Sequence, residues 1–248
     1  MKNEKLPKLI VILGPTASGK TGLAIKLAKK FNGEIVSADS GQVYKEMDIG
    51  TVKPTKEEIR KVPHYLINVV RPNREFNVAI YKKVATKAIK DIQKRGKLPF
   101  LVGGTGLYIQ AVVDNIDFPK VAPQKKIRKK LERKTPQELF KIYKKLDPKG
   151  AKFIDKHNKR RLIRAIEVCK ATKESFWQKR KKGKQLFDTL QIGIKLPREK
   201  LKTRIEKRVK EKLKEGLEKE VKTIIRKYGW GILSLQLIGY RDWKWFFE

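Results

Sequence analysis

The stretch LIVILGPTASGKTGLA, from Leu9 to Ala24, decides the fold of this chain. Its apolar beginning is typical of a buried strand with both faces covered, as in a parallel sheet. A turn containing two glycines follows, and then a helical pattern. The turn, GPTASGKT at Gly14–Thr21, fits G-x-x-x-x-G-K-[ST], the sequence of a phosphate-binding loop between a strand and a helix. The stretch therefore predicts a P-loop NTPase-like core that binds the phosphates of a ligand.

Several kinds of donor give such a loop its chemistry. Backbone N–H groups of the turn point at a phosphate, and the positive end of the following helix adds to them. Lys20 supplies a charge, and the Thr21 hydroxyl is suited to Mg²⁺, the cofactor that we expect. Because the loop selects only phosphate, phosphoryl transfer from ATP and departure of diphosphate as a leaving group both remain open. The predicted phosphate-binding residues are Gly14, Pro15, Thr16, Ala17, Ser18, Gly19, Lys20 and Thr21.

Strand and helix patterns alternate on both sides of the loop. This alternation predicts an α/β fold with a mainly parallel sheet flanked by helices. Helices are expected over residues 22–31 and 77–96, and one long helix over about 198–227, where apolar residues are spaced by four. The expected strands cover residues 8–13, 33–39, 64–70, 98–102 and 189–197.

Residues 116–188 differ in character from the rest of the chain. They are dense in Lys and Arg, follow helical patterns and contain no convincing strand. We predict that they form a smaller, basic, all-helical domain. It is inserted into a P-loop catalytic core made of residues 1–115 and 189–248.

The charge of the chain points to its partner. Lys and Arg number 62 against 26 for Asp and Glu, which gives a net charge of +36. This excess predicts an extended anionic partner, nucleic acid before membrane. A proteome biased towards lysine is the alternative explanation.

Several classes of protein are excluded or disfavoured by what the sequence lacks. Cys169 is the single cysteine and there are two histidines, so an internal disulfide is impossible and a Cys/His zinc site is not expected. The first residues do not resemble a signal peptide, and no apolar run reaches the ~18 residues of a membrane span. We therefore expect a cytoplasmic protein.

Asp39, at the end of the second expected strand, is the acidic residue most relevant to the loop. An ATP-hydrolysing enzyme usually has an apolar strand ending in Asp, which holds Mg²⁺, but the strand PFLV at residues 99–102 ends in glycines. In a parallel sheet, Asp39 would lie beside the phosphate loop, where it could bind metal or act as a general base. Capping of a helix is the alternative role. The neighbouring Ser40 and Gln42 favour a substrate-binding cluster.

Six segments in a fixed order carry a family resemblance. GPTASGKT, ADSGQVYKEMDIGTVKP, VPHYLI, LVGGTGLY, KRRLIRAIEV and LKTRIEKRVKEKLKEGLEKEV resemble the tRNA dimethylallyltransferase (tRNA isopentenyltransferase) family over roughly residues 9–240. The resemblance implies transfer of a dimethylallyl group from dimethylallyl diphosphate to N6 of an adenine next to the anticodon of tRNA, with release of diphosphate. It implies that the loop and Mg²⁺ hold the diphosphate of the prenyl donor, not ATP.

The resemblance also implies roles for individual residues. Asp39 would be the catalytic aspartate that takes a hydrogen bond or a proton from the adenine N6. Thr16 and an arginine of the C-terminal helix would meet the diphosphate, with Arg208 preferred to Arg204. The tRNA-binding residues implied are Asp39, Ser40, Gly41, Gln42 and Thr105 near the target base, and Arg160, Arg161, Leu162, Ile163 and Arg164 in the insert.

The insert would clamp the anticodon stem-loop, and we expect the enzyme to act as a monomer. The sequence departs from the family pattern at Glu46, where Gly is expected, and at Asn68, where Asp is common. Family members usually continue beyond Tyr240 into a further helix, so this chain is expected to be C-terminally short. The zinc finger of eukaryotic members is missing, which favours the bacterial type.

Three other functions compete with this interpretation. A P-loop kinase is disfavoured by the missing strand-terminal Asp and by the charge of +36. Prenylation of free adenine nucleotides would leave the long basic insert without use. A non-catalytic RNA-binding relative is disfavoured because Thr16, Lys20, Thr21 and Asp39 are all present.

Overall fold

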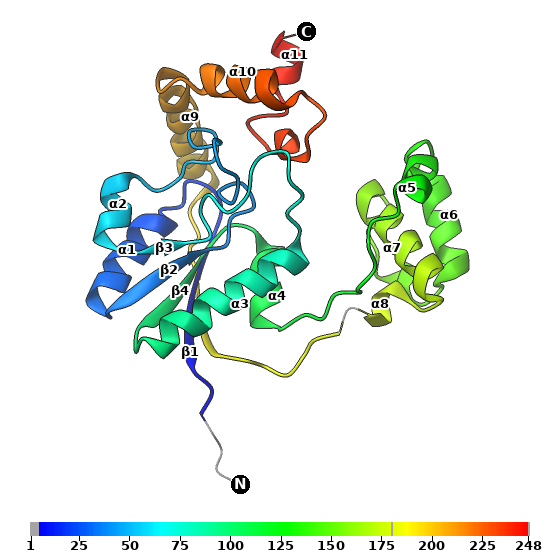
Figure 1. The fold of residues 1–248 in the computed structure, drawn as a ribbon, viewed down its shortest axis with the longest axis horizontal. Helices are drawn as coiled ribbons and strands as arrows, with labels where there is room; N and C mark the ends of the chain where they lie inside the picture. Colours follow the sequence, from blue (N-terminus) through cyan, green and yellow to red (C-terminus); the bar gives the residue numbers. More distant parts are fainter. Residues whose placement is uncertain (1–4, 180, 248) are drawn as a thin grey trace. The chain divides into compact units, whose positions relative to one another are not determined.

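The computed structural model describes residues 5–179 and 181–247 (Figure 1). The chain divides into two compact units. One unit holds Met1–Val113 and Gln185–Glu248, and the other holds Asp114–Lys184. Both boundaries fall a few residues before those expected for the insert. Asp188, expected as the last residue of the insert, begins a strand of the first unit instead.

The first unit is built on a five-stranded sheet in which every neighbouring pair of strands is parallel. The strand order is β3-β2-β4-β1-β5. This arrangement confirms the predicted α/β class with a P-loop-like core. The strands are β1 (Lys8–Leu13), β2 (Gly33–Ser37), β3 (His64–Tyr65), β4 (Leu98–Gly103) and β5 (Asp188–Gly193).

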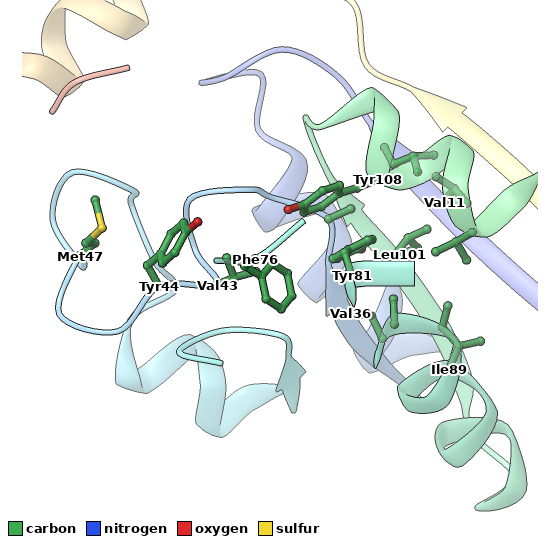
Figure 2. Close-up of a cluster of buried hydrophobic side chains, with 14 of the residues drawn as sticks. Val11, Val36, Val43, Tyr44, Met47, Phe76, Tyr81, Ile89, Leu101 and Tyr108 are labelled. Atoms are coloured by element: carbon green, nitrogen blue, oxygen red, sulfur yellow. The ribbon is translucent and has the colours of Figure 1, made fainter. Parts of the chain in front are cut away.

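Helices cover both faces of this sheet. The helices of the unit are α1 (Lys20–Lys30), α2 (Lys56–Lys61), α3 (Val78–Lys94), α4 (Gly106–Val113), α9 (Arg198–Lys214), α10 (Leu217–Tyr228) and α11 (Trp243–Phe247), with the 3-10 turn η2 (Leu233–Gln236). On one face, Leu9 of β1 packs in a core with Tyr81 of α3 and Tyr108 of α4, part of which Figure 2 shows. On the other face, Ile12 of β1 packs with Ile25 of α1. Burial on both faces explains the continuous apolar run of β1.

The strand expected at residues 64–70 is much shorter in the structure. β3 contains only His64 and Tyr65. Leu66 and Asn68 have positive φ angles of 63° and 59°, which a strand does not tolerate. The prediction is therefore wrong beyond Tyr65.

The single long helix expected at about 198–227 is also wrong. α9 ends at Lys214 and α10 begins at Leu217, because Gly216 between them has a φ of 97° in the left-handed region. Only the second half of the apolar stripe is buried. Leu217 and Val221 of α10 belong to the core of the unit, whereas no residue of α9 is buried.

The second unit contains helices and, among its described residues, no strand, as predicted. Its elements are α5 (Lys125–Glu132), α6 (Pro136–Leu146), η1 (Gly150–Lys152), α7 (Lys159–Thr172) and α8 (Phe176–Lys179). Leu139 and Tyr143 of α6 pack with Leu162 and Ile166 of α7 in a core of its own. Across the two units, the described residues contain no helix that is long and apolar enough to cross a membrane.

Candidate active site

The GPTASGKT turn leads directly from β1 into the first turn of α1. Gly14 is needed for its lack of a side chain: a side-chain carbon there would lie 2.8 Å from the Ile194 carbonyl oxygen and 3.0 Å from Ser18 Oγ. Ala17 and Gly19 adopt left-handed conformations, with φ of 63° and 93°. Such a turn directs backbone N–H groups towards one point, which suits an anion.

Two polar groups of the loop fit a phosphate ligand. Among the described residues, Ser18 Oγ is one of the few buried polar atoms without a hydrogen-bond partner, a situation that native proteins rarely leave unexplained. Lys20 Nζ donates to the carbonyl oxygen of Pro15 at 2.7 Å, which places the ammonium group over the loop. Thr21 follows Lys20 as the second residue of α1.

Lys20 interacts electrostatically with charged residues from two other parts of the first unit, Asp39 and Arg208. Burial lowers the pKa of Lys20, the nearby Asp39 partly opposes this shift, and Arg208 of α9 adds to it. Arg204, one turn earlier on α9, donates from Nη1 to the Ala17 carbonyl oxygen at 3.4 Å. Both arginines expected from the sequence therefore lie close to the phosphate loop.

In the sheet, β4 lies between β1, which leads into the phosphate loop, and β2, which leads to Asp39. Asp39 still lies close enough to Lys20 to oppose the lowering of its pKa by burial. Two glycines at the end of β4 make the approach close. A side-chain carbon at Gly103 would collide with the Ala38 backbone, and one at Gly104 would lie 3.9 Å from Lys20 Nζ. Gly104 is a site residue that sequence reasoning missed, although its motif was visible.

Asp39 heads a compact polar cluster after β2. Its Oδ1 accepts the backbone N–H groups of Gly41 at 2.8 Å and of Gln42 at 3.4 Å. Thr105, after β4, accepts the Ser40 N–H at 3.0 Å through its Oγ1. The structure thus brings together the five residues expected around a target base: Asp39, Ser40, Gly41, Gln42 and Thr105.

Gln42 connects this cluster with the long loop that follows it. The Ser37 hydroxyl donates to Gln42 Oε1 at 2.8 Å, and Gln42 Nε2 donates to the Val52 carbonyl oxygen at 3.0 Å. Gln42 is therefore held at both ends of its amide group. Any movement of the loop around Val52 would be transmitted to Gln42 and from there to the Asp39 turn.

Two stacked tyrosines support the polar cluster from the core (Figure 2). The rings of Tyr81 and Tyr108 stack at 3.8 Å between centroids, and the Tyr81 hydroxyl donates to the Ser37 carbonyl oxygen at 3.0 Å. Burial, and to a smaller degree Asp39, raises the pKa of Tyr108. The sequence contains both tyrosines but no signal that places them together.

Glu220 of α10 holds the loop of residues 46–53, and sequence reasoning missed it. Its Oε2 accepts the N–H groups of Asp48 at 2.8 Å and of Ile49 at 2.9 Å. Its Oε1 accepts the Gly50 N–H at 3.1 Å and the Tyr240 hydroxyl at 2.7 Å. One carboxylate therefore satisfies three consecutive loop amides. The loop amides are 170 to 172 residues away from Glu220 in the chain, so no local pattern reveals these contacts.

The two departures from the family pattern lie in left-handed conformations. Glu46 has a φ of 65°, and its carboxylate accepts from Lys227 at 2.7 Å and from the Tyr228 hydroxyl at 2.8 Å. Asn68 accepts from Lys53 Nζ through its Oδ1 at 2.6 Å. Glycine or asparagine is the usual residue at such φ, so the contacts of Glu46 offset a backbone cost.

The arginines expected to contact tRNA lie on α7 in the second unit. Arg160 and Arg161 are exposed. Arg164 donates to the buried Glu167 at 2.6 Å and to the Val121 carbonyl oxygen at 2.9 Å. The other two residues of the expected set, Leu162 and Ile163, are buried in the core of this unit, so their side chains are not available to an RNA.

Known proteins resemble the chain over nearly its whole length. Residues 42–248 match a family described as IPP transferase. A tRNA dimethylallyltransferase of Roseiflexus sp. (strain RS-1) is 46% identical over 97% of this chain and 80% of its own length. The crystal structure of the full-length tRNA isopentenylpyrophosphate transferase of Bacillus halodurans has a TM-score of 0.70 and 40% identity, over 97% of this chain and 77% of that one.

A more distant solved structure shares the same fold. It is described as a eukaryotic dimethylallyltransferase acting on tRNA, with a TM-score of 0.79 and 30% identity over 97% of this chain and 63% of that one. Identity at this level over this much of the chain is decisive for family membership. The chain belongs to the tRNA dimethylallyltransferase family.

Proposed function

We propose that the chain transfers a dimethylallyl group from dimethylallyl diphosphate to N6 of an adenine adjacent to the anticodon in tRNA. One arrangement carries the proposal: the residues after β4 lie against both the phosphate loop and the Asp39 turn, since a side-chain carbon at Gly104 would be 3.9 Å from Lys20 Nζ and Thr105 Oγ1 accepts the Ser40 N–H at 3.0 Å. A holder for a leaving group and a base for a nucleophile are thereby placed together. Both are required by a reaction in which an amine displaces diphosphate.

The phosphate loop would hold the diphosphate of the donor. In the reaction the bond between the allylic carbon and the diphosphate oxygen breaks, and negative charge develops on the departing group. The loop amides, the hydroxyl of Thr16 and the charges of Lys20 and Arg208 stabilise that charge, and Arg204 contributes to binding of the donor. Mg²⁺, bound through the Thr21 hydroxyl and the diphosphate, would supply further positive charge. The described residues hold no cluster of three acidic, His or Cys side chains, which fits a metal held largely by the substrate and water.

Asp39 would act on the adenine. Its carboxylate accepts a hydrogen bond from the N6 amine, orients it towards the allylic carbon, and takes its proton as the new C–N bond forms. Since Oδ1 is engaged with Gly41 and Gln42, Oδ2 is the oxygen left for the substrate. Ser40, Gln42 and Thr105 would hold the base itself.

The net charge of +36 supports an RNA substrate. Anticodon loops offer bases that can be turned out of the stack at a cost of only a few kcal/mol. The second unit, with Arg160, Arg161 and Arg164 on α7, would contact the anticodon stem-loop. We infer a monomeric enzyme that acts in the cytoplasm.

The test is direct transfer with a matched pair of variants. The protein is incubated with Mg²⁺, dimethylallyl diphosphate and unmodified tRNA, and the nucleosides are analysed by mass spectrometry for N6-prenyladenosine. Asp39→Asn retains Oδ1 and removes the base, so it should abolish transfer while tRNA binding stays intact. Asp188→Asn, at the exposed start of β5, is the control. Turnover of ATP without prenylated product would overturn the proposal.

A further inference from the structure

An aromatic pair lies exposed on the second unit. The rings of Phe153 and Trp177 stack with their centroids 4.9 Å apart and their planes 14° from parallel. Phe153 is 60% exposed and Trp177 is 42% exposed. Aromatic side chains gain most from burial, so two rings that cover each other only in part and remain open to solvent need an explanation.

A buried carboxylate fixes both segments that carry the rings. Asp147, only 3% exposed, accepts the Gly150 N–H at 2.9 Å, just before Phe153. It also accepts the Ser175 hydroxyl at 2.7 Å and the Trp177 N–H at 3.5 Å. The backbone positions of the two rings are therefore set by the same buried group. A preformed surface loses little conformational entropy when a ligand binds to it.

The surroundings of the pair select a polyanion. Residues 114–184 contain 25 Lys and Arg against eight Asp and Glu, a net charge of +17. Four exposed lysines lie within four residues of one of the rings in the sequence: Lys149, Lys152, Lys156 and Lys173. Flat aromatic faces among positive charges are the combination by which proteins bind unpaired nucleotides, the base stacking on the ring and the phosphate meeting the lysines.

We propose that the Phe153–Trp177 pair is a stacking surface for an unpaired base of the RNA substrate. The inference rests on the proposed function only in taking tRNA as the substrate, and it adds a contact by two residues that have no assigned role in the candidate active site. Bases inside a duplex are hidden from such a surface. The contact therefore recognises a single-stranded nucleotide and not the stem.

The salt dependence of binding separates stacking from charge. Phe153→Ala and Trp177→Ala should each weaken binding of unmodified tRNA by about 5- to 150-fold, the range for loss of one stacked base. The slope of log Kd against log salt should stay unchanged because no charge is removed. Phe31→Ala, which removes a 53% exposed ring beside Lys30 in the first unit, is the matched control and should leave Kd unchanged.

Two further measurements keep the inference open to contradiction. Trp177→Phe keeps an aromatic face and should retain most of the affinity for tRNA. Phe153→Leu keeps apolar packing against Trp177 but removes an aromatic face, so it should lose affinity for tRNA. A duplex RNA without unpaired bases should bind the wild type and all variants equally. If folded Trp177→Ala bound tRNA as tightly as the wild type does, the inference would be overturned. It would also be overturned if the variant lost as much affinity for the duplex RNA as for tRNA. Prenyl transfer at saturating tRNA should persist in every variant, so its absence in the wild type would instead contradict the proposed function.

Discussion

Glu34 of β2 shows how a single residue couples the stability of the sheet to pH. It is 1% exposed, and its oxygens accept from Arg95 and Lys97 at 2.7 Å. The hydrogen bond from Arg95 outweighs the effect of burial and lowers the pKa of Glu34 to about 2. Because the folded pKa lies below the ordinary value of 4.5, the stabilisation is complete above about pH 4.5 and is lost as the pH falls towards 2.

Glu34→Gln should remove this pH dependence. The charged carboxylate contributes on the order of 3 kcal/mol at neutral pH by this linkage, so the variant should be less stable at pH 7 and close to the wild type near pH 2.5. Urea unfolding at both pH values measures the difference. Glu206→Gln, on the exposed face of α9, is the control. A constant difference between the Glu34 variant and the wild type at both pH values would contradict the prediction.

Arg208 and Arg204 should differ in their effect on catalysis. Arg208 lies close enough to lower the pKa of Lys20, whereas Arg204 is engaged with the Ala17 carbonyl oxygen. We expect Arg208→Ala to reduce kcat about 100-fold, as for loss of one donor to a developing charge. Arg204→Ala should act mainly on KM for dimethylallyl diphosphate. Single-turnover kinetics with saturating donor separates the two, and the reverse order would assign the diphosphate contact to Arg204.

Among the elements, the break between α9 and α10 decides how the C-terminal part reaches the site. Gly216 allows the chain to turn at a φ of 97°. α10 can then bury Leu217 and Val221, while α9 keeps its arginines near the phosphate loop. The spacing of apolar residues by four continues across the break, which is why periodicity predicted one helix. The glycine was the signal that should have outweighed it.

Gly216→Ala should therefore destabilise the chain. A side chain in the left-handed region costs about 1–2 kcal/mol, and nothing lies near enough to repay it. Gly22→Ala is the matched change, since Gly22 lies within α1 with open space around it and alanine favours a helix by about 0.5–1 kcal/mol. Denaturant midpoints should move in opposite directions for the two variants. A shift of both in the same direction would show that Gly216 is not the cause of the break.

Glu220 should affect binding of tRNA more than binding of the donor. It holds the loop of residues 46–53, whose Val52 carbonyl oxygen accepts from Gln42 of the predicted base-binding cluster. Glu220→Ala leaves three loop amides without their acceptor and should raise KM for tRNA about 10-fold, roughly 1.4 kcal/mol, with little change in KM for dimethylallyl diphosphate. Glu220→Gln keeps one oxygen acceptor, so its KM for tRNA should lie between that of the wild type and that of Glu220→Ala. Glu218→Gln, which only loses an ion pair with Lys222, is the control.

A Glu220→Ala variant with both KM values raised equally would contradict this assignment. Such a result would mean that α10 supports the whole site and not the loop alone. A normal KM for tRNA would mean that the loop keeps its shape without the carboxylate.

At the scale of the whole molecule, the sequence predicted what depends on local pattern. Gly14–Thr21 lies where its motif requires, and the parallel sheet and the helical second unit follow from periodicity. Strand order, in contrast, depends on packing across the sheet, so the position of β4 between β2 and β1 was not predictable. The reach of Glu220 to Asp48 and the stacking of Tyr81 on Tyr108 have no local signal for the same reason.

The charge of the molecule is spread over both units, yet it is denser in residues 114–184. That unit has a net charge of +17 in 71 residues, within a total of +36 for the chain. If it tracks the phosphates of a stem, binding of tRNA should release counterions, and log Kd should rise linearly with log salt by about 0.9 for each phosphate neutralised.

Arg160 and Arg161 test where that charge acts. They are exposed on α7, so Arg160→Ala with Arg161→Ala should weaken binding for all tRNA sequences alike and reduce the salt slope by about two, one for each phosphate contact. Lys87→Ala with Lys90→Ala removes the same charge from the exposed side of α3 and should leave the slope unchanged. Equal effects of the two double variants would mean that net charge alone attracts the RNA. A specific loss from α7 would instead show that the helix follows the phosphate backbone, leaving recognition of bases to aromatic and hydrogen-bonding side chains.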